Sequence, residues 1–372
     1  MSFYPTCLHY DDFNPDLALA QYGRKDVERA LSKDTLGTND FLALLSPAAE
    51  DYIEEMAQKA HRLTVQHFGK VIQLYTPLYL SNFCTNQCLY CGFNAENKIV
   101  RKQLSLEEVE KEAVEIAKTG LKHILILTGG ARHIATPEYL QQCTRIVAKH
   151  FSSVCIEVYE LETEEYADLV NAGVDCLTIY QETYNIGLYR ALHPSGPKKN
   201  FEYRLTAPDR AAAAGIRSVN IGALLGLDSW RREAFLTGLH GDYIQRTFPE
   251  VELGLSLPRI KPHEGSFHPP HTVSDRSFVQ IMLAFRLFLP RAGITISTRE
   301  SAAFRDNIIR LGATKMSAGS STKVGGWTSG SKDIGQFDIS DHRSVQEIKL
   351  QIQRLGYQPV FKDWQRIMDK AV

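Results

Sequence analysis

The sequence predicts an α/β protein built as a (β/α)₈ barrel, with a helical segment before the barrel and a short extension after it. Two observations predict this fold. Eight short apolar runs, each the length of a β-strand, follow one another between residues 71 and 320. The stretches between them are long enough for helices, and several carry helix-start and helix-stop residues. Eight such units in about 250 residues match the size of a (β/α)₈ barrel.

The chain before the first strand is predicted to be helical over residues 25–70. Its last helix, within 47–69, has a proline near its start, apolar residues three to four positions apart, and a terminal glycine. We therefore expect an N-terminal helical segment (1–70), a barrel (71–322) and a C-terminal extension packing on the barrel (323–372). The expected strands are 71–80, 123–130, 154–160, 176–183, 217–226, 251–260, 294–300 and 313–320.

The connecting segments support this alternation. The segment SLEEVEKEAVEIAKTG, from Ser105, has a glutamate three residues after the serine, as in a capping box, and it ends in lysine and glycine. The segment TEEYADLVNAG closes on Gly173 in the same way. A doubly wound open sheet is the alternative, but its phosphate-binding turn needs glycines after the first strand, where this chain has cysteines. The barrel is therefore favoured.

The composition is that of an ordinary soluble globular protein. Of the 372 residues, 44% are hydrophobic and 23% charged, and 42 basic against 43 acidic residues give a formal net charge of -1. This balance excludes binding of nucleic acid through an excess of positive charge. No run approaches the ~20 apolar residues of a membrane span, and the N-terminus lacks a signal-peptide pattern. We expect a cytoplasmic protein without a nucleic-acid or membrane partner.

Three of the seven cysteines are clustered directly after the first expected strand. Cys84, Cys88 and Cys91 form the pattern C-x₃-C-x₂-C. Parallel α/β folds place their chemistry at the carboxyl ends of the strands, so the location suits a site. The remaining cysteines are scattered singly, which argues against a disulfide framework; they are Cys7, Cys143, Cys155 and Cys176.

Zinc and an iron–sulfur cluster are the two metal sites to compare. Structural zinc takes four nitrogen or sulfur donors, usually in two paired halves, and this sequence offers no second half with standard spacing. A [4Fe–4S] cluster has four irons, so three cysteines leave one iron without a protein ligand. That open iron is free to bind a substrate. A zinc-stabilised barrel acting as a scaffold is the non-enzymatic alternative.

With Tyr90 just before the third cysteine, the motif resembles the signature of radical S-adenosylmethionine (SAM) enzymes, which carry it after the first strand of an α/β barrel. The resemblance implies a [4Fe–4S] cluster held by Cys84, Cys88 and Cys91, whose open iron binds the amino and carboxylate groups of SAM. It further implies that an electron from the reduced cluster cleaves SAM. The resulting 5′-deoxyadenosyl radical would take a hydrogen atom from the substrate.

Longer blocks resemble one family within this superfamily, the 2-iminoacetate synthases, which are tyrosine lyases of anaerobic thiamine thiazole biosynthesis. The blocks span residues 77–364 and are PLYLSNFCTNQCLYCGF, YQETYNIGLYRALHPSGPKKNFEYRL, PDRAAAAGIRSVNIGALLGLDSWR, STRES and LGYQPVFKDW. The resemblance implies cleavage of the Cα–Cβ bond of L-tyrosine to 2-iminoacetate and p-cresol, while SAM becomes 5′-deoxyadenosine and methionine. It also implies a thiazole synthase as protein partner and a reducing system of the flavodoxin/NADPH type.

Two related families are the alternatives. The tyrosine lyase of hydrogenase maturation resembles this chain through the barrel but carries a second cysteine-bound cluster in a C-terminal extension, and no cysteine follows Cys176 here. The tryptophan lyase of thiopeptide biosynthesis shares the scaffold. It lacks an ending of the PVFKDW type, as far as the resemblance goes. Both are therefore ranked below 2-iminoacetate synthase.

The resemblance assigns SAM contacts to the ends of the second, third and fourth strands. Tyr90 is expected to lie against the adenine. Related enzymes have a GGE-like turn for the SAM amino group, and the matching residues here are Thr128, Gly129 and Gly130. Because the usual glutamate is absent, only backbone carbonyls are available in this turn.

Three polar residues at the next strand ends are expected to hold the ribose hydroxyls or the ammonium of SAM. They are Glu157, Gln181 and Glu182. A charge-assisted hydrogen bond from such a side chain is strong in a dry cavity.

Two arginines are assigned to the two carboxylates of the reaction. Arg204 is expected to pair with the carboxylate of SAM, and Arg299, at the end of the seventh strand, with that of tyrosine. A guanidinium grips a carboxylate bidentately and so fixes which hydrogen faces the radical. Hydrogen abstraction from the amino nitrogen permits Cα–Cβ scission.

Arg259 is interpreted instead as part of a structural ion pair. The tyrosine pocket is expected to include Ser317, Gly319 and Ser320.

Two further segments are assigned no catalytic role. The segment STKVGGWTSGSKD (321–333) lacks the residue order of a nucleotide-binding loop and is expected to be a mobile segment over the barrel mouth or a plain connector. The segment HPSGPKK (193–199) is expected to be a solvated loop or part of a partner surface. The histidines show no metal-site spacing and are given no function.

Overall fold

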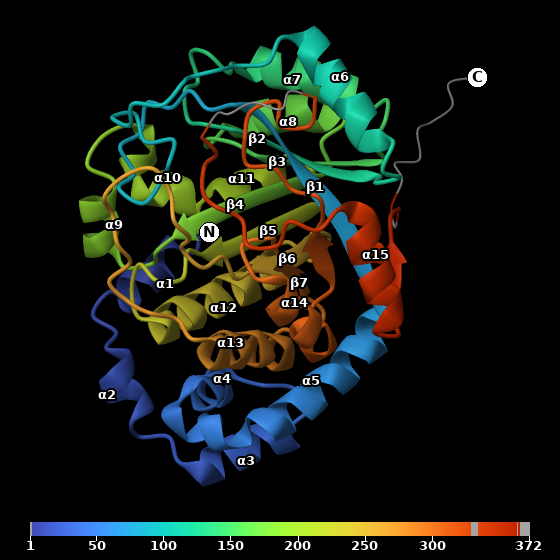
Figure 1. The fold of residues 1–372 in the computed structure, drawn as a ribbon. Coiled ribbons are helices and arrows are strands. Elements are labelled where there is room, and N and C mark those ends of the chain that lie inside the picture. Colours follow the sequence, from blue (N-terminus) through green and yellow to red (C-terminus); the bar gives the residue numbers. More distant parts are fainter. Residues whose placement is uncertain (1, 329–333, 363, 365–372) are drawn as a thin grey trace.

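A closed barrel of eight parallel strands forms the centre of the protein, as predicted (Figure 1). The computed structural model describes residues 2–328, 334–362 and 364. The ring closes because β1 pairs with β2 on one side and with β8 on the other. The strands are β1 (Val71–Ser81), β2 (His123–Thr128), β3 (Ser153–Glu157), β4 (Cys176–Glu182), β5 (Ser218–Ala223), β6 (Glu252–Ser256), β7 (Gly293–Ile296), β8 (Lys315–Ser317) and β9 (Gln358–Val360).

Helices surround the ring on its outside (Figure 1). The α-helices are α1 (Tyr4–His9), α2 (Pro15–Leu19), α3 (Arg24–Ser32), α4 (Thr38–Leu45), α5 (Ile53–Phe68), α6 (Leu106–Ala117), α7 (Pro137–Val147), α8 (Thr163–Ala172), α9 (Ile186–Leu192), α10 (Phe201–Leu205), α11 (Ala207–Ala213), α12 (Trp230–Thr247), α13 (Asp275–Phe288), α14 (Ala302–Ile308) and α15 (Val345–Arg354). Three 3₁₀ helices are also described, η1 (Pro47–Tyr52), η2 (Pro197–Lys199) and η3 (Ile309–Leu311).

Each of the eight predicted runs overlaps a barrel strand, and most strands end before the runs do. The difference arises because residues after the last ladder hydrogen bond turn into the βα loops that build the site. The strand β9 was not predicted. It pairs in parallel with the first three residues of β1, and three residues that include a proline give too little alternation to be recognised. Parts of the expected segments 321–333 and 323–372 lie outside the described residues, namely 329–333, 363 and 365–372.

Local signals in the sequence set the helix ends. The Ser105 hydroxyl accepts the Glu108 N–H at 3.2 Å, and the Glu108 carboxylate accepts the Ser105 N–H at 2.8 Å, which is the predicted capping box of α6. Helix α8 ends at Gly173, whose φ of 124° favours glycine. The capping box thus fixes where α6 begins, and Gly173 fixes where the chain leaves α8 for the next strand.

The N-terminal helices pack on one side of the barrel. Helices α4 and α5 contact α13 along its length (Figure 1). The ring of Phe41 on α4 stacks on Phe288 of α13 with centroids 4.3 Å apart, and it also faces Gly238 of α12. A Cβ on Gly238 would collide with the Phe41 ring. Close packing at Gly238 therefore fixes the position of α4, and with it the N-terminal helical segment, against the barrel helices α12 and α13.

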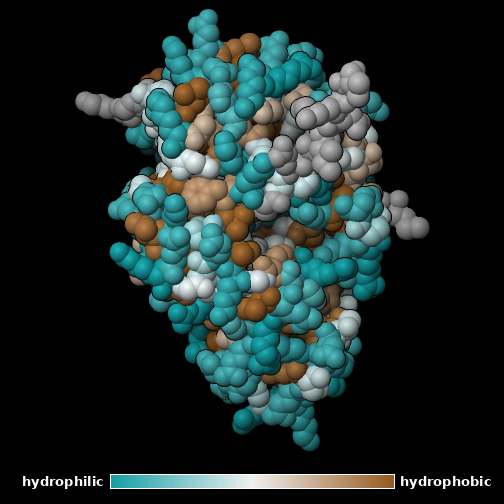
Figure 2. Space-filling view, turned by 90° about the vertical axis from the view of Figure 1, so that its right-hand side faces the viewer, coloured by the Kyte–Doolittle hydropathy of each residue, from teal (hydrophilic) through white to brown (hydrophobic). Residues whose placement is uncertain are grey.

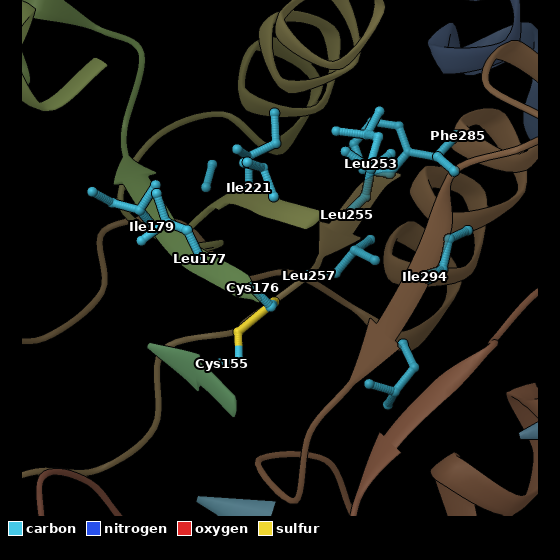
Figure 3. Close-up of a cluster of buried hydrophobic side chains, with 14 of the residues drawn as sticks. Cys155, Cys176, Leu177, Ile179, Ile221, Leu253, Leu255, Leu257, Phe285 and Ile294 are labelled. Carbon is cyan, nitrogen blue, oxygen red and sulfur yellow. A yellow bond between two sulfur atoms is a disulfide. The ribbon is translucent and has the colours of Figure 1, made fainter. Parts of the chain in front are cut away.

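Apolar side chains on the strands form the layer between the ring and the helices (Figure 3). Leu253 of β6 lies beside Phe285 of α13, and both are buried. Figure 3 also shows a disulfide between Cys155 of β3 and Cys176 of β4. Their scattered positions in the sequence argue against a disulfide framework and do not predict this one pair; the other five cysteines are free. One βα unit separates Cys155 and Cys176 in sequence, and the parallel register places them directly opposite each other.

Two ends of the barrel differ in character. The strands end toward the left of Figure 1, where the cysteine motif lies. At the other end, where the strands begin, the barrel encloses a cavity of about 410 Å³ lined by residues such as Gln73, His123 and Asn220. Figure 2 shows this end, with a mainly hydrophilic surface that is hollowed near its middle. Among the described helices, none is both long enough and apolar enough to cross a membrane.

A buried carboxyl group on α12 fastens the turn after β4. Glu233 accepts hydrogen bonds from the Thr183 hydroxyl at 2.6 Å and from the Tyr184 N–H at 3.0 Å. The turn begins at Glu182, a non-glycine residue with a φ of 70°, which is a strained conformation. Burial raises the pKa of Glu233 to about 8, against the lowering effect of its two hydrogen bonds. Glu233 thus fixes the two residues that follow the strained Glu182.

Replacing Gly238 by alanine should destabilise the protein by about 1–3 kcal/mol, because the new Cβ overpacks against Phe41. The matched control is Gly187→Ala in α9, where the nearest atom is the Asn185 side-chain oxygen at 3.6 Å. That control should gain about 0.5–1 kcal/mol from helix propensity. Thermal unfolding checks both variants, and a G238A midpoint at or above wild type would contradict the packing argument.

Replacing Glu233 by glutamine should flatten the pH dependence of stability. An unfolded glutamate loses its proton near its ordinary pKa of 4.5, whereas the folded one keeps it up to a pKa of about 8. The wild-type free energy of unfolding therefore falls as pH rises through this window. The melting temperature measured between pH 5 and 8 should fall less steeply in E233Q. The exposed Glu164→Gln should keep the wild-type slope, and an unchanged slope in E233Q would refute the assignment.

Candidate active site

The three clustered cysteines lie in a loop that follows β1 at the carboxyl end of the barrel. None of them is in a disulfide. The loop is held by Arg101, whose guanidinium donates to the backbone carbonyls of Asn82, Phe93 and Asn94 at 2.6–2.9 Å. Three carbonyls bound by one side chain fix the curvature of the loop. No sequence pattern identifies Arg101, because its partners are backbone atoms.

Backbone and side-chain amides donate hydrogen bonds to the cysteine sulfurs. The N–H groups of Asn86 and Gly130 each lie 3.4 Å from Cys84 Sγ, and Gln336 Nε2 lies 3.8 Å from Cys91 Sγ. Amide donors around sulfur stabilise thiolate ligands and tune the potential of iron–sulfur clusters. The donor set therefore fits a [4Fe–4S] cluster bound by Cys84, Cys88 and Cys91.

Burial opposes ionisation of two of these thiols, Cys88 and Cys91. It raises the pKa of Cys88 to about 12 and also raises the pKa of Cys91. Metal binding to cysteine displaces the thiol proton, so iron has to supply the charge that stabilises the thiolates here. In the part of the chain that the structure describes, no three His, Cys, Asp or Glu side chains converge on a single-ion site. That finding concerns one-ion sites, whereas each cysteine of a cluster binds a different iron.

The turn after β2 receives the cysteine loop. A Cβ on Gly129 would collide with the backbone of Phe83, and a Cβ on Gly130 with the side-chain amide of Asn86. The Gly130 carbonyl accepts the Thr85 hydroxyl at 2.8 Å. The two glycines thus serve close packing of the loop. The Thr128 hydroxyl is buried without a hydrogen-bond partner within the described chain, so it is available to a ligand.

Three buried charged groups and the partly buried Lys198 form a network beside the loop. Glu182 accepts Lys198 Nζ at 2.6 Å and Arg204 at 3.5 Å, and Arg204 also pairs with Glu160 at 2.5 Å. Burial raises the pKa of Glu182, but Lys198 and Arg204 outweigh it and leave that pKa below its ordinary value. Glu182 is therefore a carboxylate at neutral pH.

Arg204, which is predicted to bind the carboxylate of SAM, has several partners within the protein. Besides the two carboxylates, its Nε donates to the Tyr180 carbonyl at 2.7 Å. A guanidinium whose nitrogens are already bound within the protein has little left to offer a ligand carboxylate. The geometry assigns Arg204 to positioning Glu182. Gln181 also points into the protein, with Nε2 3.5 Å from the Phe201 carbonyl.

The segment 193–199 is exposed at Pro194, Ser195, Pro197 and Lys199, in keeping with a solvated loop or a partner surface, but two of its side chains turn inward. His193 is buried, and Lys198 reaches inward to Glu182. His193 Nδ1 lies 2.7 Å from the Tyr189 carbonyl and must donate to it, so Nε2 accepts the Tyr90 hydroxyl at 2.6 Å. Burial lowers the pKa of His193 to about 3, in keeping with the neutral tautomer. The polar composition did not reveal these two inward side chains, because their partners Tyr90 and Glu182 lie on other segments.

Two adjoining cavities of about 60 Å³ each lie between the cysteine loop and the barrel axis. One is bordered by Tyr90, Cys91, Glu182 and Lys198. The other lies deeper and is bordered by apolar and aromatic side chains together with Ser317 and Ser320. Both share Glu157, Tyr180, Arg299 and Phe337. The larger cavity at the opposite end is not taken as the site, because barrel chemistry belongs at the carboxyl ends of the strands.

Polar groups in the deeper cavity are placed to bind a ligand. Arg299 forms no ion pair among the described residues; its guanidinium lies over the Phe337 ring, 3.4 Å from the centroid. Arg259, in contrast, pairs with Glu300 and Asp275, as interpreted from sequence. The Ser320 hydroxyl is buried and has no partner in the described structure, whereas Ser317 Oγ accepts the Thr298 N–H at 2.9 Å.

Glu157 separates the two cavities. Burial raises the pKa of its carboxyl group to about 7, with Arg299 acting in the opposite direction. A carboxyl group that titrates near neutral pH between two ligand spaces is able to hold or accept a proton. The sequence predicted this residue as a ligand contact from its place at the end of β3, and the structure adds its position between the cavities.

Residues 78–237 match the model of the radical SAM superfamily, and residues 256–358 match the biotin and thiamin synthesis associated domain. A 2-iminoacetate synthase of Salmonella typhimurium and one of Escherichia coli are each 39% identical to this chain over 347 residues, covering 93% of this chain and 92% of the relative.

A solved structure of HydG, a maturase of the [FeFe]-hydrogenase, is similar with a TM-score of 0.88 and 30% identity, over 94% of this chain and 79% of that chain. The methylornithine synthase PylB shares the fold, with a TM-score of 0.74 and 20% identity, over 90% of this chain and 97% of that chain. By its match to curated relatives over nearly its whole length, the chain belongs to the 2-iminoacetate synthase family of radical SAM enzymes.

Proposed function

We propose that this protein cleaves the Cα–Cβ bond of L-tyrosine to 2-iminoacetate and p-cresol, while SAM is converted to 5′-deoxyadenosine and methionine. The observation that carries this proposal is the 39% identity to 2-iminoacetate synthases over 93% of the chain. The cysteine loop and the adjoining cavities at the carboxyl end of the barrel support it. We further propose that the product serves a thiazole synthase partner, and that a flavodoxin/NADPH-type system supplies the electron.

Cys84, Cys88 and Cys91 would hold the [4Fe–4S] cluster. When bound, the cluster and SAM supply a 5′-deoxyadenosyl radical that removes a hydrogen atom from the substrate. The cavity bordered by Tyr90, Glu182 and Lys198 would hold SAM, since it lies directly against Cys91. Glu182 would accept hydrogen bonds from a hydroxyl or ammonium group, because it stays ionised. The unpartnered Thr128 hydroxyl and the Gly129 and Gly130 backbone would contribute further polar contacts.

The deeper cavity would hold tyrosine. Arg299 would bind its carboxylate, because this guanidinium forms no ion pair among the described residues and lines the cavity. Ser317 and Ser320 border the same space, and aromatic and aliphatic side chains would surround the phenol ring. Glu157 would hold or accept a proton at the substrate nitrogen, since its pKa lies near neutral pH. These contacts would orient the amino group toward the neighbouring cavity.

The activity test uses protein reconstituted with iron and sulfide under anaerobic conditions, then reduced in the presence of SAM and tyrosine. We expect p-cresol, 5′-deoxyadenosine and 2-iminoacetate, the last detected as its hydrolysis product glyoxylate, by liquid chromatography and mass spectrometry. Cluster-replete protein that forms neither p-cresol nor 5′-deoxyadenosine would refute the proposal. An indole product formed from tryptophan alone would support the tryptophan-lyase alternative, and a colourless protein that binds one zinc would support the scaffold alternative.

Replacing Arg299 by alanine should lower kcat/KM for tyrosine by roughly a hundredfold or more, because a misplaced substrate loses its alignment with the radical. Iron content and cluster absorption should stay at the wild-type level. The control is Arg132→Ala, which removes a largely exposed guanidinium paired with Glu165 near the same end of the barrel. Wild-type turnover in R299A, or equal losses in the two variants, would contradict the assigned role.

A further inference from the structure

A segment far from the cysteines in sequence crosses the mouth of the barrel and meets them. This return segment, residues 334–338, is anchored through its backbone. The Gln336 N–H donates to the Thr322 carbonyl at 3.1 Å, and the Asp338 N–H donates to the Pro262 carbonyl at 2.9 Å. The Thr322 hydroxyl in turn donates to the Phe337 carbonyl at 2.9 Å. Hydrogen bonds to the loops after β6 and β8 thus hold the return segment over the site.

The side chain of Gln336 is oriented by a buried tyrosine. The Tyr79 hydroxyl donates to Gln336 Oε1 at 2.8 Å, so the amide nitrogen is turned toward Cys91 Sγ, 3.8 Å away. Burial raises the pKa of Tyr79 well above its ordinary value, so its hydroxyl remains a donor. An amide whose oxygen is already bound has its N–H groups left to donate, and the sulfur is the acceptor within reach.

Close packing against the cysteine loop keeps this contact in place. Gly92 follows Cys91 directly, and a Cβ there would collide with the backbone carbonyl of Gln336. A Cβ on Gly335 would collide with the Thr322 hydroxyl. Glycine is therefore required on both sides of the contact. The adjacent Phe337 extends the segment into the site, where it borders both small cavities and lies under Arg299.

We propose that Gln336 is a positioning residue that donates a hydrogen bond to the cluster ligand Cys91 and thereby raises the reduction potential of the cluster. The inference rests on the proposed function, because it requires a cluster on the three cysteines. Reduction adds negative charge that is shared with the thiolate sulfurs, and an N–H donor aimed at one of them stabilises the reduced state. The return segment thus links closure over the substrate cavity to the ease of cluster reduction.

The test is an anaerobic redox titration of the reconstituted protein without substrate, followed by the electron paramagnetic resonance signal of the reduced cluster. Gln336→Leu removes the donor. Gln336→Glu keeps the oxygen that accepts from Tyr79 but replaces the amide donor by a negative charge. At a fixed solution potential, the ratio of reduced to oxidised cluster should fall roughly threefold to tenfold in Q336L, the equilibrium factor of one hydrogen bond. It should fall at least as far in Q336E.

The matched control is Gln142→Leu, the same substitution at an exposed position of α7, which should keep the wild-type potential. Iron content and absorption spectra are measured for every protein, so the potentials compare equally loaded clusters. Wild-type potentials in both loaded Gln336 variants would overturn the inference, as would an equal shift in Q142L. If Q336L does not bind a cluster, the reduction potential measured for Q336E decides whether the inference holds. Failure of wild-type protein to bind any cluster would overturn the proposed function itself, which keeps the two failures distinguishable.

Discussion

The contact between two turns, at the carboxyl ends of β1 and β2, is the constraint on which the site depends. The cysteine loop approaches the turn after β2 so closely that neither Gly129 nor Gly130 can carry a side chain without displacing it. The approach brings the Gly130 N–H to Cys84 Sγ and the Gly130 carbonyl to Thr85. A glutamate at position 130, as in a GGE-like turn, would have to displace the side chain of Asn86. That side chain accepts the Lys198 N–H at 2.9 Å, so the shift would also disturb the segment that carries Lys198.

A network of paired charges beside the cysteine loop is the second constraint on the site. Two carboxylates, Glu160 and Glu182, share the cations Arg204 and Lys198 in a region with little exposure to water. Removing one member of a buried pair leaves an uncompensated charge that typically costs about 3–5 kcal/mol. The network is thus stable only as a unit, and it presents one ionised carboxylate, Glu182, to the cavity. The strain at Glu182 is tolerated because the Leu224 N–H binds the Glu182 carbonyl and Glu233 binds the two residues that follow.

Much of this arrangement could be predicted from sequence, and the rest could not for identifiable reasons. The eight strands follow from short apolar runs, and the position of Cys84, Glu157 and Arg299 at strand ends follows from strand order. Lys198 and His193 were missed because a polar loop looks solvated unless its buried partners are known. Gln336 lies 245 residues from Cys91, and no local pattern links two residues at such a separation. The Cys155–Cys176 disulfide required the register of β3 against β4, which spacing alone does not give.

The size of the two small cavities indicates what has to move for ligands to enter. Ligand pockets commonly measure about 300–1,000 Å³, whereas these two cavities measure about 60 Å³ each. Phe337 borders both, and its ring stacks on the face of the Arg299 guanidinium, whereas a carboxylate binds at the N–H edge. Displacement of Phe337 would therefore join the cavities. Because Gln336 is the preceding residue, such a movement would also alter the hydrogen bond to Cys91. Substrate entry and cluster potential would then be coupled through two adjacent side chains.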